Sequence, residues 1–323
     1  MRHRARCSPG ARATKAPNPT HKETDDDKAH FHPLVDKRYF CEGPRWHEGQ
    51  LWFSDFYAHE DCSVGLVGDV RAEISLGDEQ PSGLGWLPGG DLLVVGMTKR
   101  QVLRCSADKS LTVHAELAGI ATFHANDMLV TPEGDAYVGN FGFDLDAFLM
   151  AHGVEGLLAA LGTDNSSLLL PFLGKLAQVK PDGTTSVAAE PMLFPNGMVL
   201  LDGGRTLVVA QTLGFELTAF DRAPDGALSN RRVWASLKEA MVAPDGICVD
   251  ARGGIWVANA LAPVVMRVEE GGLVTDTVTT SQNAYACALG GPEGRHLLIC
   301  TAPTSVHSLA AAEANGRLEM AEV

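Results

Sequence analysis

Five positions along the chain place a polar side chain directly before a short apolar run, where it could act as a ligand or a catalytic group. Together with a sixth, apolar residue at the corresponding place, they are Glu42, Ser82, Asn126, Asn196, Asp245 and Ala286. The two acids and the two amides offer only oxygen donors. Such a set suits a hard divalent cation, Ca²⁺ first, then Mg²⁺ or Mn²⁺, with Zn²⁺ less favoured.

A cation would also solve a problem that the two acids create. A carboxylate buried without a partner is strongly unfavourable, and two carboxylates brought together raise each other's pKa. If Glu42 and Asp245 meet in a buried channel, a bound divalent cation removes the repulsion between them. We therefore expect one divalent cation as the cofactor.

A turn is the alternative interpretation of part of this set, because Asn-Gly and Asp-Gly are common turn dipeptides. Asn196-Gly197 and Asp245-Gly246 each fit it when taken alone. Their shared place before the first apolar run of a repeat favours the ligand interpretation. The tips of hairpins carry other pairs, such as Asp182-Gly183.

The elements that must position these residues are repeats of two short apolar runs joined by a turn. The six positions recur at intervals of 40, 44, 70, 49 and 41 residues. Repeats of about 40–50 residues built from strands and turns are typical of propeller blades. Pro, Gly and Asp between the runs, as in 87–91 and 131–135, indicate antiparallel hairpins. The sequence predicts an all-β fold, a six-bladed β-propeller of four-stranded antiparallel blades, with the six positions in one ring around its axis.

The 70-residue interval holds an insertion of about 144–171. Apolar residues at helical spacing in 147–150 and 154–161 predict a short helical insertion in or after the third blade. Two interpretations stay open, a packed surface excursion and a lid over one face of the propeller.

Composition limits the partners. Of 323 residues, 26 are Lys or Arg and 40 are Asp or Glu, which gives a net charge of −14. An acidic chain is a poor match for nucleic acid or an anionic membrane, and we expect neither. The seven scattered cysteines form no C-x-x-C pair, which fits a cytoplasmic location.

Residues 1–29 have the composition of a disordered tail. Residues 30–323 are therefore predicted to form the propeller, and the protein is expected to be a monomer by default.

His124 lies two residues before Asn126, which places both side chains on one side of an extended strand. We expect His124 to contact substrate, although an isolated His is more often structural or exposed. No G-x-S-x-G, H-E-x-x-H or phosphate-binding loop is present in the sequence.

Several segments resemble the SMP-30/gluconolactonase/LRE-like family of six-bladed propellers. The matching segments are Glu42-Gly43-Pro44-Arg45-Trp46, Asn126-Asp127-Met128, Pro195-Asn196-Gly197-Met198 and Pro244-Asp245-Gly246-Ile247, within a resemblance that runs from about Phe40 to Ala302. The resemblance implies that Glu42, Asn196 and Asp245 are divalent-metal ligands, with Asn126 a fourth ligand or a substrate contact.

Two features depart from the pattern of that family. The animal lactonases that the chain resembles carry an Arg where His124 stands, and it helps to hold sugar hydroxyls. The apolar insertion at 144–171 is also not part of the minimal family pattern. Both departures favour a less polar ring or ester over a sugar lactone.

The function predicted from these residues is metal-dependent hydrolysis of a small-molecule lactone or related ester. The cation would act as a Lewis acid, Asp245 as the general base, and Asn126 and His124 would orient the substrate. Two alternatives stay open. One is phosphotriester hydrolysis at the same site, and the other is a non-catalytic propeller that binds Ca²⁺.

Overall fold

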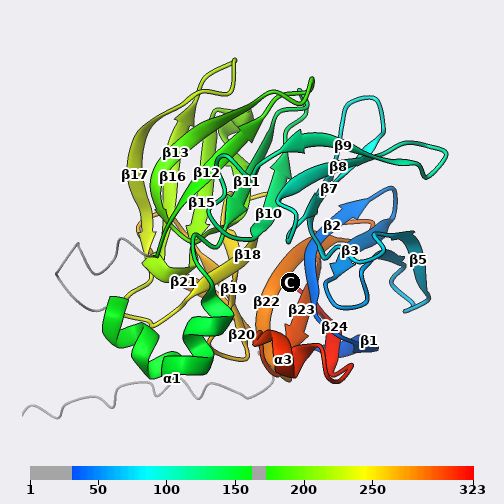
Figure 1. The fold of residues 1–323 in the computed structure, drawn as a ribbon. Coiled ribbons are helices and arrows are strands. Elements are labelled where there is room, and N and C mark those ends of the chain that lie inside the picture. The colour runs from blue at the N-terminus through cyan, green and yellow to red at the C-terminus, as the bar shows by residue number, and fades with distance from the viewer. Residues whose placement is uncertain (1–30, 162–171) are drawn as a thin grey trace, which may run out of the picture.

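Six four-stranded antiparallel sheets surround a common axis in the computed structural model, which describes residues 31–161 and 172–323 (Figure 1). The predicted six-bladed β-propeller is confirmed. The tail predicted for residues 1–29 lies outside the described residues, as does the end of the insertion, 162–171.

Each blade runs from an innermost to an outermost strand in chain order, except the last. The first blade is β2 (Cys41–His47), β3 (Gln50–Asp55), β4 (Glu60–Val64) and β5 (Val70–Ser75). The second is β6 (Pro81–Trp86), β7 (Leu92–Gly96), β8 (Gln101–Cys105) and β9 (Leu111–Glu116). The third is β10 (Ala125–Val130), β11 (Ala136–Asn140), β12 (Leu173–Val179) and β13 (Thr185–Leu193).

The other three blades repeat the arrangement. The fourth is β14 (Pro195–Leu201), β15 (Thr206–Gln211), β16 (Glu216–Arg222) and β17 (Leu228–Ser236). The fifth is β18 (Pro244–Val249), β19 (Ile255–Asn259), β20 (Val264–Val268) and β21 (Val274–Thr279). The sixth is β22 (Asn283–Gly290), β23 (His296–Ala302), β24 (Gly316–Glu322) and β1 (His32–Arg38). Short 3₁₀ turns lie at Asp202–Gly204 and Thr212–Gly214.

The sixth blade closes the ring by joining both ends of the described chain. β1 pairs antiparallel with β24, so that His32 lies opposite Met320. This pairing gives β24 a partner on its outer edge and fixes the first blade beside the last.

The core lies between the faces of neighbouring blades. All five residues of β7 are buried, as are all five of β11 and of β19, because both faces of each sheet are covered. One cluster joins Leu93 and Val95 of the second blade to Met128 and Val138 of the third. Continuous apolar runs, rather than alternating ones, are what such doubly covered strands require.

The predicted helical insertion is confirmed as α1 (Leu145–Leu161), which lies between the second and third strands of the third blade. Gly153 kinks it with φ +67°. A second short helix, α3 (His307–Ala310), lies on the same side of the propeller (Figure 1). Within 31–161 and 172–323, no helix is long and apolar enough to cross a membrane.

Candidate metal centre and active-site cavity

The innermost strands bring the predicted ring together. Glu42, Ser82, Asn126, Asn196 and Asp245 each occupy the second position of an innermost strand, and Ala286 lies on the sixth such strand. All six are buried. Glu42, Asn126, Asn196 and Asp245 line one cavity of about 860 Å³, together with His124, whereas Ser82 and Ala286 are not part of its lining.

A local irregularity aims these side chains at the axis. In every innermost strand the pairing with the next strand shifts register at the ring position, for example between Pro195 and Met198 and between Pro244 and Ile247. A bulge of this kind bends the strand and redirects a side chain. Asn196-Gly197 and Asp245-Gly246 are therefore parts of bulged strands and not hairpin turns.

The glycines that follow are required because the strands crowd together at the hub. A Cβ on Gly197 would lie 2.5 Å from the backbone N of Ile247, and one on Gly246 would lie 2.5 Å from the Cβ of Ala286. Only glycine lets the inner strands of adjacent blades approach so closely.

The orientation of the Asn196 amide is fixed by a neighbour. Thr212 Oγ1 donates to the carbonyl oxygen of Pro244 at 2.8 Å, so its single proton is used there. The hydroxyl oxygen can then only accept, and Asn196 Nδ2 donates to it at 3.1 Å. The carbonyl Oδ1 of Asn196 is thereby directed away from Thr212, as a ligand oxygen would need to be.

The two acids of the ring are in an unfavourable environment. Burial raises the pKa of Glu42 well above its ordinary value, and the neighbouring charges of Asp245 and Asp127 add to the effect. Burial and the charge of Asp127 raise the pKa of Asp245 in the same way, while a side-chain hydrogen bond with Asn196 opposes the shift. When both are ionised, the carboxylates of Glu42 and Asp245 therefore repel each other, and a positive charge between them would remove this repulsion.

Within 31–161 and 172–323, Arg45 is the cation that reaches this acidic hub. Arg45 Nη2 lies 2.9 Å from Asp127 Oδ1 and also donates to the carbonyl oxygen of Met128 at 2.6 Å. When Glu42, Asp127 and Asp245 are ionised, the single guanidinium leaves an excess of two negative charges. That excess equals the charge of one divalent cation.

A buried oxygen without a partner supports the same interpretation. Asp245 Oδ1 is buried and has no hydrogen-bond partner among the described residues. Unpaired carboxylate oxygens are costly in a protein interior. The oxygen donors, the excess charge and this orphaned atom fit a divalent cation held by Glu42, Asn196 and Asp245. No group of three or more His, Cys, Asp or Glu with metal-binding geometry occurs in the described part of the chain, so amides would have to complete the set.

Asn126 and His124 differ in their surroundings. Ser82 Oγ donates to Asn126 Oδ1 at 3.4 Å, a long contact that leaves Nδ2 directed elsewhere. The His124 ring stacks on Phe123 with centroids 4.2 Å apart. Burial lowers the pKa of His124, opposed by the carboxylates of Asp144 and Asp146, so the neutral imidazole is favoured.

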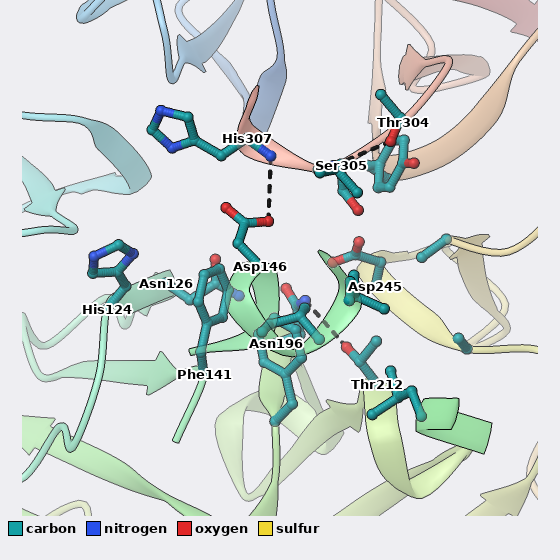
Figure 2. Close-up of a pocket in the computed structure, with 18 of the residues that line it drawn as sticks. His124, Asn126, Phe141, Asp146, Asn196, Thr212, Asp245, Thr304, Ser305 and His307 are labelled. Carbon is teal, nitrogen blue, oxygen red and sulfur yellow. Dashed lines mark hydrogen bonds between the residues drawn. The ribbon is translucent and has the colours of Figure 1, made fainter. Parts of the chain in front are cut away.

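The rest of the cavity wall is mostly apolar. Phe123, Phe141, Phe194 and Phe215 line it, as do several residues of α1. Figure 2 shows Asn126, Asn196 and Asp245 around one space, with Asp146 extending toward His307. Asp146 Oδ1 accepts the backbone N–H of His307 at 3.2 Å, which ties α1 to α3 across the cavity.

Four residues of this site were not predicted from the sequence. Asp127 could have been found by the repeat itself, because it stands where four of the other repeats carry Gly, and a charge there has to be paired. Arg45, its partner, is 82 positions away. Thr212 and Asp146 follow no pattern that the repeat supplies.

The chain resembles known proteins in both sequence and fold. The sequence pattern of the SMP-30/Gluconolactonase/LRE-like region matches residues 40–303. Regucalcin of Xenopus laevis is 30% identical over 271 residues, which cover 81% of this chain and 82% of the relative.

Two solved structures have the same fold. A gluconolactonase of Xanthomonas campestris superposes with a TM-score of 0.67 at 22% identity, covering 91% of this chain and 89% of that one. A regucalcin of Agrobacterium tumefaciens, described as a calcium-binding protein, gives a TM-score of 0.69 at 18% identity, covering 91% and 95%.

Proposed function

The chain belongs to the SMP-30/gluconolactonase/LRE-like family, and we propose that it is a divalent-metal-dependent hydrolase that opens a lactone or a related ester. One observation carries the proposal. At the hub, the acids Glu42 and Asp245 line a cavity large enough for a small molecule, and Asp245 Oδ1 has no hydrogen-bond partner among the described residues. The family includes lactonases, which makes ester hydrolysis the first reaction to test.

Glu42, Asn196 and Asp245 are the proposed ligands. When bound, a divalent cation supplies positive charge that stabilises the oxyanion formed when water attacks an ester carbonyl. Asn196 offers Oδ1 because Thr212 occupies its Nδ2. Calcium is the first choice because all the donors are oxygens, with Mg²⁺, Mn²⁺ and Zn²⁺ to be compared.

Asp245 is the proposed general base. Asp245 Oδ1 has no hydrogen-bond partner among the described residues, so this carboxylate is available to accept the proton of an attacking water. Asn126 Nδ2 and the neutral His124 ring line the same cavity and are proposed to orient the substrate. Asn126 is proposed mainly as a substrate contact, since Ser82 already donates to its Oδ1.

A lactone panel with controlled metal content tests the proposal. Protein stripped with EDTA should hydrolyse no lactone, and Ca²⁺ or Mn²⁺ should restore activity. Asp245→Asn should stay inactive with either metal, whereas Asp78→Asn, which changes an exposed acid paired with Lys99, should behave as the unmodified protein. Activity that is indifferent to EDTA and to added metal would refute the proposal.

The same assay separates the alternatives. Paraoxon in the panel tests phosphotriester hydrolysis. A protein that binds Ca²⁺ with gain of thermal stability, but hydrolyses neither substrate class, would be a non-catalytic calcium-binding propeller.

A further inference from the structure

We infer, on the basis of the proposed function, that the substrate is an uncharged lactone or ester with an apolar body, held against helix α1, and not a polyhydroxylated sugar lactone. Helix α1 is rich in apolar residues. Its apolar residues occur on more than one side, which is typical of a helix that is covered on more than one side.

One side of α1 is covered by the propeller. Leu157 packs in a buried cluster with Phe172, Phe194 and Leu213, joined by Phe148 and Leu149. Asp144 Oδ1 accepts the backbone N–H of Ala147 at 2.9 Å and so caps the start of the helix. These contacts hold α1 in place without using the rest of its apolar residues.

The remaining apolar residues of α1 line the cavity. Those outside the buried cluster that do so are Ala147, Met150, Val154 and Leu158. Met150 is 68% exposed and Val154 is 46% exposed, which are large values for such side chains. Because this surface belongs to the cavity that contains Asp245, the occupant that would cover it is the molecule bound there.

Apolar side chains of the propeller blades line the cavity as well. They include Phe123, Phe141, Phe215 and Met97, and the Tyr57 ring is also part of the lining. Ring edges and faces of this kind contact hydrocarbon favourably but cannot satisfy a row of hydroxyl groups. The polar side chains that also line the cavity, among them Gln80, Asn283 and Ser305, come from segments other than α1. Each sugar hydroxyl that lost its water without gaining a partner would weaken binding.

The charged residues that line the cavity limit the class of substrate further. Neither Lys nor Arg occurs among the described residues that line the cavity, whereas Asp144 and Asp146 do. A substrate that carried a carboxylate or phosphate would find no counter-ion there and would be repelled by those two acids. The body of the substrate is therefore uncharged.

Three γ-lactones that share one ring test this inference. The first carries an unbranched alkyl chain, the second a polyhydroxylated chain of similar length, and the third an alkyl chain that ends in a carboxylate. We expect kcat/KM for the alkyl lactone to exceed the other two by at least about tenfold. A hydroxylated or carboxylated lactone that is hydrolysed equally well overturns the inference.

Val154→Thr tests the role of α1, because it exchanges a methyl for a hydroxyl at a half-exposed position that tolerates the change. KM for the alkyl lactone should rise about threefold to tenfold, and KM for the hydroxylated lactone should not. Val113→Thr is the matched control, since Val113 on β9 is 51% exposed and lies outside the cavity. An equal effect of Val154→Thr on both lactones, or the same effect from Val113→Thr, would contradict the inference.

A binding measurement keeps the inference separate from the proposed function. The alkyl γ-lactam, which is not hydrolysed, should displace a polarity-sensitive dye from the cavity, and the hydroxylated lactam should not. If no lactone is hydrolysed with any metal, the proposed function fails while the lactam result still decides the nature of the cavity. If lactones are hydrolysed but the alkyl lactam binds no better than the hydroxylated one, the inference alone fails.

Discussion

Replacing Thr212 by Val should weaken metal binding although Thr212 is not a proposed ligand. The change keeps the shape of the side chain but removes the hydroxyl that fixes Asn196. The Pro244 carbonyl loses its donor and Asn196 Nδ2 loses its acceptor. An unsatisfied buried group costs about 1–3 kcal/mol, so with two such groups the free energy of unfolding should fall by roughly 2–6 kcal/mol.

The effect on metal affinity follows from the freed amide. Without Thr212 Oγ1, the Asn196 side chain can turn over and present Nδ2, a donor, where a ligand oxygen is needed. Groups that orient metal ligands typically contribute about 10–100-fold to affinity. This corresponds to about 1.4–2.7 kcal/mol of binding free energy.

Thr212→Ser separates orientation from packing, because Ser keeps the hydroxyl and loses only a methyl. Calorimetric titration of Ca²⁺ into EDTA-treated protein should give the Ser variant a Kd within about threefold of the unmodified protein. The Val variant should bind about 10–100-fold more weakly. Equal affinity of the Val and unmodified proteins would show that the hydroxyl does not position Asn196, and an equally large loss in the Ser variant would point to packing.

Three further predictions concern stability and catalysis. Burial raises the pKa of Asp61 to about 7, so the folded state binds more protons than the unfolded state above pH 4 and stability falls as pH rises from there through 7. The shift is worth roughly 4 kcal/mol by pH 8, and Asp61→Asn should flatten that fall in urea denaturation at pH 5 and pH 8. Asp245→Asn should abolish lactone hydrolysis yet raise the melting temperature of metal-free protein at neutral pH, because it removes the repulsion with Glu42; a lower melting temperature would contradict this. Gly246→Ala should lower the free energy of unfolding by about 1–3 kcal/mol because its Cβ meets the next blade, whereas Gly119→Ala, with nothing within 4 Å, should change it by less than about 0.5 kcal/mol.

The repeat made most of the fold predictable. Each innermost strand begins one residue before its ring position in five of the six blades, so the spacing of Glu42, Ser82 and their equivalents located the blades as well as the site. The reason is that the innermost strand both begins a blade and carries the side chain of the ring. In four of the six blades the inner strand carries Gly at a fixed place, where it approaches its neighbour closely, and the side chain before that Gly is the ring residue.

Features that depend on a single contact between distant segments were not predictable. β1 lies outside the repeat pattern and has meaning only through β24, at the other end of the described chain. The ion pair of Arg45 with Asp127 joins the first and third blades. The direction in which the Asn196 amide points depends on one proton of Thr212, which no residue pattern encodes.

The proposed reaction and its specificity come from different parts of the chain. The proposed ligands lie on strands that the closed ring fixes on both sides, and such rigid elements are suited to holding a cation. The apolar wall comes from α1, which is attached through Leu157 and through Asp146 to the His307 backbone. Substitutions in α1 such as Val154→Thr should therefore change substrate preference and leave Ca²⁺ affinity unaltered. Joint loss of both would mean that α1 also supports the hub.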